Sequence, residues 1–66
     1  MEITVNDQTR HVVEGITVAQ LLTELTLSTP HLAVEVNLDL VPRQEHAKRR
    51  LAAGDRVEIV TLVGGG

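Results

Sequence analysis

The sequence predicts one α+β domain, in which a single helix packs across one face of a mixed sheet of four to five strands. Several short stretches alternate apolar and polar residues with the two-residue period of a strand, and one internal stretch has the helical period. A chain of 66 residues has room for one small domain. Ile, Leu and Val supply 22 of those residues, which is enough for a purely aliphatic core.

The first strand is predicted at the start of the chain, where Ile3 and Val5 alternate with polar residues. The Asn6-Asp7-Gln8 segment that follows has the composition of a turn, because Asn and Asp tolerate left-handed backbone and form local hydrogen bonds. The chain therefore opens on a hairpin.

A second extended stretch is predicted over residues 9–14, before Gly15. With Asp7-Gln8 as a two-residue turn, Ile3 faces Val12 across the hairpin. One more loop residue would bring Val13 to that side instead, because a shift of one residue reverses every side chain. We expect Val12 to point inward.

The helix is predicted to begin after Thr17, which reads as an N-cap, and Gln20 completes a capping box. Ile16 and Leu21 have the spacing of a hydrophobic staple. The apolar face follows the helical repeat and consists of Val18, Leu21, Leu22 and Leu25. We expect the Ser28-Thr29-Pro30 segment to end the helix, because proline removes a donor and disfavours helix just before it.

A third strand is predicted over residues 32–37, where Leu32, Val34 and Val36 alternate with Ala33, Glu35 and Asn37. Leu38-Asp39 is expected to turn the chain into a short Leu40-Val41 strand. Pro42 confines that strand to the edge of the sheet. Residues 43–50 are polar and irregular, with at most a helical turn.

The last strand is predicted over residues 56–62, after a turn at Gly54-Asp55. Val57 and Ile59 are expected to face the helix. The opposite face of this strand then consists of Glu58, Val60 and Leu62.

The order β-β-α-β-β-β favours a β-grasp arrangement, in which the single helix crosses one face and the first and last strands lie parallel at the centre of the sheet. We expect residues 1–63 to form this domain and residues 64–66 to form a flexible C-terminal glycine tail.

The tail is the one place where the sequence indicates chemistry. Gly64-Gly65-Gly66 directly continues a strong strand, and glycine loses the most entropy on ordering. A narrow channel in a partner could admit such a thread and reach its terminal carboxylate, where any Cβ would clash. Phosphoryl activation by a nucleotide would turn that carboxylate into an acyl donor. The alternative interpretation is a frayed end or a cloning remnant.

Val60 and Leu62 are two aliphatic residues predicted on the outer face beside the tail, next to Glu58. Contiguous exposed apolar surface is typical of a partner site. Isolated surface Val and Leu are also common, so this pattern alone leaves both interpretations open.

Composition excludes several other functions. The chain has no Cys, which removes disulfides and thiolate chemistry and favours a reducing cytoplasm. It has no aromatic residue and a net charge of −3, which argues against nucleic-acid binding. No apolar run is long enough to span a membrane. The scattered His11, His31 and His46 do not indicate a metal site, and Lys48-Arg49-Arg50 is interpreted as a solvated loop.

The whole chain resembles the ThiS family, the bacterial sulfur carrier proteins of thiamine biosynthesis, which share the ubiquitin-like fold. The resemblance is carried by an ordered set of motifs that ends in a terminal Gly-Gly; each motif is weak alone, and the full set is strong. These motifs are the Asn6-Asp7 hairpin, Gly15-Ile16-Thr17-Val18 before Leu21-Leu22, Ala33-Val34-Glu35-Val36-Asn37, Val41-Pro42-Arg43, Gly54-Asp55-Arg56-Val57-Glu58 and Val60-Thr61-Leu62-Val63-Gly64-Gly65-Gly66. Gly64 departs from the pattern, since many relatives carry a side chain there.

The resemblance implies that Gly66 is the working residue. An ATP-dependent adenylating enzyme of the E1 type would adenylate its α-carboxylate, and sulfur drawn from cysteine by a desulfurase would then replace AMP. The resulting thiocarboxylate would pass its sulfur to thiazole synthase. Partner contacts are expected at Glu58, Val60, Leu62, Val63, Gly64 and Gly65. The chain would be a cytoplasmic cosubstrate with no bound cofactor and no active site of its own.

Three alternatives remain open at this point. The chain could carry sulfur for molybdopterin or another pathway, since the tail alone does not distinguish them. It could be an enzyme subunit whose tail completes a partner's active site. It could also be a ubiquitin-like modifier that is conjugated to lysines.

Overall fold

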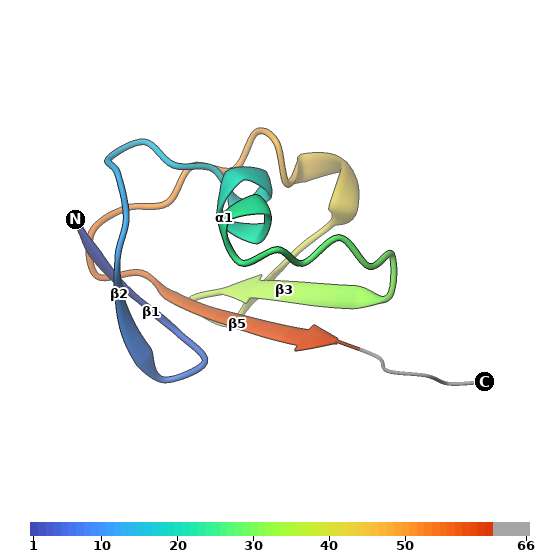
Figure 1. Ribbon diagram of the computed structural model, residues 1–66, viewed down its shortest axis with the longest axis horizontal. Helices are drawn as coiled ribbons and strands as arrows, with labels where there is room; N and C mark the ends of the chain where they lie inside the picture. The colour runs from blue at the N-terminus through green and yellow to red at the C-terminus, as the bar shows by residue number, and fades with distance from the viewer. Residues whose placement is uncertain (62–66) are drawn as a thin grey trace.

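The computed structural model describes residues 1–61 and contains five strands, one α-helix and one 3-10 helix within them (Figure 1). In chain order these elements are β1 (Glu2–Val5), β2 (Gln8–His11), α1 (Val18–Glu24), β3 (Leu32–Val36), β4 (Asp39–Val41), η1 (Arg43–Glu45) and β5 (Arg56–Thr61).

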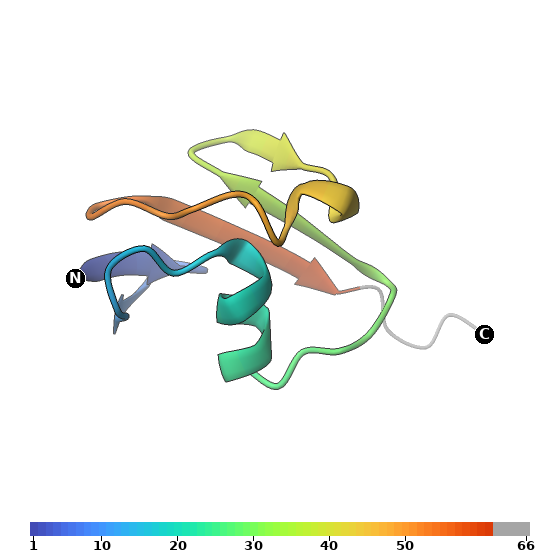
Figure 2. The same ribbon diagram turned by 90° about the horizontal axis from the view of Figure 1, so that it is seen from above.

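The five strands form one mixed sheet in the order β2-β1-β5-β3-β4. β5 lies at its centre, parallel to β1 and antiparallel to β3. Figure 2 shows α1 crossing over one face of this sheet. The predicted β-grasp arrangement, with the first and last strands parallel, is therefore confirmed, and the sheet has five strands.

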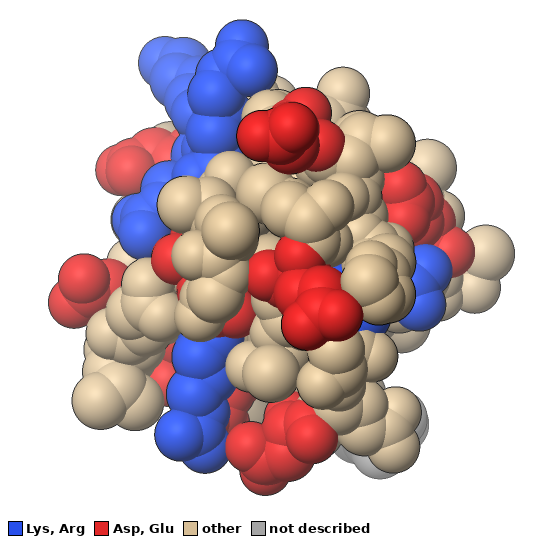
Figure 3. Space-filling view, turned by 90° about the vertical axis from the view of Figure 1, so that its left-hand side faces the viewer, with Lys and Arg blue, Asp and Glu red and all other residues tan. Residues whose placement is uncertain are grey.

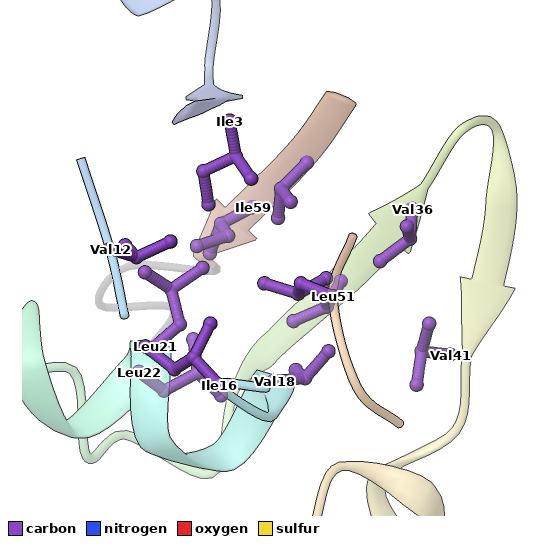
Figure 4. Packing of buried hydrophobic residues seen from close by; sticks show 12 residues of the cluster. Ile3, Val12, Ile16, Val18, Leu21, Leu22, Val36, Val41, Leu51 and Ile59 are labelled. Atoms are coloured by element: carbon purple, nitrogen blue, oxygen red, sulfur yellow. The ribbon is translucent and has the colours of Figure 1, made fainter. Parts of the chain in front are cut away.

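The core lies between α1 and the inner face of the sheet and is entirely aliphatic (Figure 4). Val57 and Ile59 are buried on β5, as the alternation of that strand predicts. Both the capping-box helix and the strands contribute to this core. Its members are Ile3, Val12, Ile16, Val18, Leu21, Leu22, Val34, Val36, Val41, Leu51, Val57 and Ile59.

The β1–β2 turn consists of Asn6 and Asp7, so the prediction of Asp7-Gln8 is wrong. Both residues have positive φ, 48° and 69°, the backbone of a type I′ turn. Ile3 consequently lies opposite Arg10 rather than Val12.

Val12 nevertheless points inward, as predicted, and is 7% exposed, whereas Val13 is 67% exposed. The predicted register differs from the observed one by two residues, and a two-residue shift leaves every side chain on its original face. The strand itself is shorter than predicted, because β2 ends at His11. Beyond it, Val12 still exchanges two main-chain hydrogen bonds with Met1, of 2.8 and 2.7 Å.

The first turn of α1 has all of its main-chain donors paired. Thr17 and Gln20 form the predicted capping box, with hydrogen bonds of 3.1 and 2.9 Å. The amides of Val18 and Ala19 donate to carbonyl oxygens of Arg49 and His46, each at 2.9 Å. The loop after η1 therefore closes this end of the helix.

The helix ends at Glu24, earlier than the predicted stop at Ser28-Thr29-Pro30. Thr26 has a φ of 56°, and its amide donates to the Thr23 carbonyl at 3.0 Å. The Leu27 amide donates to the Leu22 carbonyl at 2.9 Å, which completes a Schellman motif. Sequence reasoning missed this end because a β-branched residue rarely adopts the left-handed conformation.

The β3–β4 turn consists of Asn37 and Leu38, with φ values of 52° and 73°, and not of Leu38-Asp39. β4 consequently begins at Asp39. The strand lies at the edge of the sheet, as Pro42 predicts.

The turn before β5 contains Gly54 with a φ of 84°. β5 follows it from Arg56 to Thr61, the last described residue. None of the helices within residues 1–61 is both long and apolar enough to cross a bilayer.

Candidate functional site

The candidate site is the C-terminal end of β5 together with the glycine tail that follows in the sequence. The predicted reactive residue, Gly66, lies outside the described residues, and so do the predicted contact residues Leu62, Val63, Gly64 and Gly65. The structure therefore locates β5 as far as Thr61, and with it two of the predicted contact residues, Glu58 and Val60.

Glu58 and Val60 lie on the outer face of the sheet, opposite the face that α1 covers. Their β5 neighbours Val57 and Ile59 are buried, whereas Val60 is 57% exposed. This confirms the predicted register for the described part of the last strand.

Strand pairing brings further residues to the same face. Across β3 and β5, Ala33 lies opposite Val60 and Glu35 lies opposite Glu58. Across β3 and β4, Leu40 lies opposite Glu35 and is 65% exposed. These five residues, Ala33, Glu35, Leu40, Glu58 and Val60, are called the outer-face patch below.

Sequence reasoning identified two residues of the outer-face patch and missed three. The alternation over residues 32–36 already turns Ala33 and Glu35 away from the core. The local pattern could not show that these residues lie next to Glu58 and Val60, because it does not specify which strands are neighbours.

The charges beside the outer-face patch are partly paired. Arg56 contacts Glu58 through Nε at 3.4 Å and Asp7 through a guanidinium nitrogen at 3.1 Å. Asp55 accepts hydrogen bonds from Asn37 Nδ2 and the Ala52 amide. Exposed pairs of this kind contribute about 0–1 kcal/mol to stability, so they affect encounter with a charged partner more than folding.

Figure 3 views the end of the molecule where the N-terminus lies, away from the candidate site. Basic and acidic side chains are intermingled on this face rather than gathered into one field of a single sign. Within the basic run 48–50, Lys48 and Arg50 are exposed, in agreement with its interpretation as a solvated loop.

The three histidines have separate surroundings. His11 lies 3.1 Å from Glu2 at the exposed edge of the sheet. His46 is buried, and its Nε2 lies 3.0 Å from the Val41 carbonyl oxygen. Within residues 1–61, no group of three or more histidine or acidic side chains lies together in a way that could hold a metal ion.

Asn6 is a residue near the candidate site that sequence reasoning assigned only to a turn. Its Oδ1 accepts a 2.8 Å hydrogen bond from the Ile59 amide, and its Nδ2 donates to the Ile59 carbonyl at 3.1 Å. These two bonds join residues 53 positions apart in sequence. No local signal indicates them, because they depend on the pairing of β1 with β5.

A recess of about 380 Å³ lies on the helix side of this same strand end. It is open to solvent and runs between the β1–β2 hairpin, the end of α1 and the last residues of β5. Its lining residues are Val5, Asn6, Gln8, Leu25, Leu27, Ile59 and Thr61.

A model of the ThiS family matches residues 2–66. The chain belongs to the ThiS family. The sulfur carrier protein ThiS of Escherichia coli is 32% identical over 66 residues, and the match covers all of both chains. The sequence resemblance to this family is thereby confirmed.

Solved structures of the ThiS family have the same fold. The crystal structure of the thiamine biosynthesis protein ThiS from Geobacter metallireducens matches with a TM-score of 0.85 and 30% identity, over the whole of both chains. The solution structure of a thiamine biosynthesis protein from the same organism matches with a TM-score of 0.83, over all of this chain and 88% of that one.

A further ThiS-like segment occurs within a longer relative. A protein of Paramagnetospirillum magneticum named thiazole synthase is 38% identical over 66 residues. The match covers the whole of this chain and 20% of that protein, so this chain spans one fifth of the relative's length.

Proposed function

We propose that this chain is a sulfur carrier of thiamine biosynthesis that works from the α-carboxylate of Gly66. The observation that carries the proposal is the family match over residues 2–66, which includes the whole glycine tail. The end-to-end match to the Escherichia coli carrier supports it. The proposal requires Gly66 to be the last residue of the mature protein.

The proposed chemistry takes place in three steps on the main-chain terminus. An ATP-dependent adenylating enzyme joins the Gly66 carboxylate to AMP and releases pyrophosphate. In the second step, the outer sulfur of a persulfide that a cysteine desulfurase has formed on a partner's cysteine attacks the acyl carbon and displaces AMP, which gives an acyl disulfide. In the third step, a thiol of the partner attacks the cysteine sulfur of that acyl disulfide. The thiol and the cysteine form a disulfide, and the Gly66 thiocarboxylate leaves. The absence of Cys from the chain is consistent with sulfur held on the main-chain terminus rather than on a thiol.

Thiazole synthase is the proposed acceptor of this sulfur. The Paramagnetospirillum magneticum relative supports this choice, because a segment similar to this whole chain is part of a protein of that name. A carrier and the enzyme that it serves must meet repeatedly. Joining the carrier-like segment and the enzyme in one chain, as in that relative, would give the two a high effective concentration.

The outer-face patch is the proposed docking surface for both enzymes, with Leu62, Val63, Gly64 and Gly65 as further contacts. Val60 and Leu40 are large apolar side chains exposed beside the strand that leads to the tail. Burial of such residues contributes about 25 cal/mol per Å² to association. Glu35 and Glu58 give the patch an acidic character, which favours basic residues on the partner.

In this proposal the chain is a cosubstrate rather than an enzyme. Its residues bind and present the carboxylate, and the groups that activate it belong to the partners. ATP is bound by the adenylating enzyme and not by this chain. Because the proposed adenylating enzyme uses ATP, the proposed location is the bacterial cytoplasm.

Intact-mass spectrometry tests the proposal. The mass of the purified protein first establishes whether the chain ends at Gly66. After incubation with the adenylating enzyme, ATP, cysteine and a desulfurase, the protein should gain about 16 Da, because sulfur replaces one oxygen. A chain that lacks Gly66 serves as the control and should gain nothing. A large covalent adduct to another protein would instead indicate a modifier, and an unchanged mass would contradict the proposal.

A further inference from the structure

The C-terminal half of β5 has a strand on one edge only. On the β3 side, pairing continues to Thr61, which lies opposite Leu32. On the β1 side, the pairing ends at Val57, because β1 turns away after Val5. In Figure 1 the β1–β2 hairpin lies beside β5 at this point.

The side chain of Asn6 continues the β1 ladder beyond the end of that strand. The Asn6 amide donates to the Val57 carbonyl at 2.9 Å, the last main-chain bond of the ladder. In a parallel pair, the Ile59 amide and carbonyl would next bond to main-chain groups of β1. The carboxamide of Asn6 takes both places, at 2.8 and 3.1 Å.

These bonds exist only because Asn6 occupies a special backbone position. Its φ of 48° belongs to the type I′ turn, and the turn directs the side chain back along β5. Without the Asn6 side chain, the amide and the carbonyl of Ile59 would lose these hydrogen-bond partners, although Ile59 as a residue is only 8% exposed. The bonds therefore hold Ile59, two residues before the end of the described part of β5, on its second edge.

We propose that Asn6 is a positioning residue for the activation of the tail. It fixes the direction of β5 as far as Thr61, the point from which the following residues must reach the active site of the adenylating enzyme when the carrier is docked. This inference rests on the proposed function. It adds a role for a residue that lies on neither the tail nor the outer-face patch.

Asn37 provides a matched control within the same chain. It occupies the first position of the other type I′ turn, with a φ of 52°. Its side chain also makes two hydrogen bonds of 3.0 Å, one from the Arg56 amide and one to Asp55. These bonds hold the beginning of β5, far along the strand from the tail.

The experiment compares Asn6→Gly with Asn37→Gly. Glycine adopts positive φ readily, so each variant keeps its turn and loses only the side-chain bonds. Both should lower the melting temperature by similar amounts. ATP–pyrophosphate exchange by the adenylating enzyme, measured over a range of carrier concentrations, then separates kcat from KM.

A positioning role predicts that Asn6→Gly lowers kcat about tenfold and changes KM by less than about twofold, because the docking surface is intact but the terminus is misplaced. Asn37→Gly should leave both constants within about twofold of the wild type. In Asn6→Gly the Ile59 amide should also exchange with solvent faster, as NMR can measure. If Asn6→Gly does not fold, Asn6→Asp replaces it. One carboxylate oxygen can still accept the hydrogen bond from the Ile59 amide, but the other faces the Ile59 carbonyl and cannot donate to it, so one of the two bonds is lost.

Equal kcat values for the Asn6 and Asn37 variants would overturn the inference, as would a loss confined to KM. Both results leave the proposed function intact, because the wild-type chain is still adenylated. If the wild-type chain itself supports no exchange, the proposed function fails and the positioning role fails with it.

Discussion

Glu35 and Glu58 lie directly opposite each other on the outer face of β3 and β5. Glu58 has Arg56 at 3.4 Å, whereas among residues 1–61 no cation lies within salt-bridge distance of Glu35. Like charges in this position repel and destabilise a sheet by about 0.2–1 kcal/mol. A basic residue on a docked partner would relieve this repulsion.

Replacing Glu35 by Gln should therefore stabilise the free domain. We expect a gain of about 0.2–1 kcal/mol in the free energy of unfolding, which for a domain of this size raises the melting temperature by roughly 1–8 °C. Thermal unfolding followed by circular dichroism measures it. Glu14→Gln, which removes the same charge from an exposed loop, should change the melting temperature less. A lower melting temperature for Glu35→Gln would show that repulsion is not the dominant effect.

Val60→Asp should weaken docking far more than folding. Val60 is 57% exposed, and surface substitutions usually change the free energy of unfolding by about 0.5 kcal/mol or less. If the outer-face patch binds the adenylating enzyme, a charge in place of this apolar side chain should raise the dissociation constant about tenfold, which is roughly 1.4 kcal/mol. Titration calorimetry with the enzyme measures this constant.

Val13→Asp is the matched control for Val60→Asp. Val13 is 67% exposed, but it lies in the loop between β2 and α1, outside the outer-face patch. It should bind the enzyme as the wild type does. The docking assignment would be wrong if the two variants bound equally well, or if Val13→Asp alone lost affinity.

Leu38→Gly should raise stability, although it removes a large apolar side chain. Leu38 has a φ of 73° and is 78% exposed, so it has left-handed backbone strain and little packing to offset it. Left-handed backbone costs an L-residue about 1–2 kcal/mol, which glycine avoids. Glycine loses more conformational entropy on folding, and this loss offsets roughly half of the gain. The expected gain is about 0.5–1 kcal/mol by urea unfolding. A loss of stability would mean that Leu38 makes contacts that its exposure does not suggest.

The sequence predicted those parts of the fold that depend on local patterns. The start of α1 follows from Thr17 and Gln20, which lie three residues apart and need no tertiary contact. The inner faces of β3 and β5 follow from the alternation of apolar residues. The inward position of Val12 also survived a wrong turn assignment, because the error was an even number of residues.

The parts that were missed depend on backbone conformations or distant contacts. Thr26 and Leu38 adopt positive φ, which their residue types do not predict. The contact of Asn6 with Ile59 requires β1 and β5 to be neighbours. The same holds for the placement of Ala33 beside Val60, which extends the predicted contact residues into a continuous surface.

Adenylation of the tail is the central claim, and the most direct measurement compares two forms of the same polypeptide. One carries a free carboxylate on Gly66 and the other, made by chemical ligation, carries an amide there. Incubated with the adenylating enzyme, ATP and labelled pyrophosphate, the free acid should support exchange of label into ATP, and the amide should support none. Equal exchange with both forms would contradict the account, because activation would then occur somewhere other than the Gly66 carboxylate.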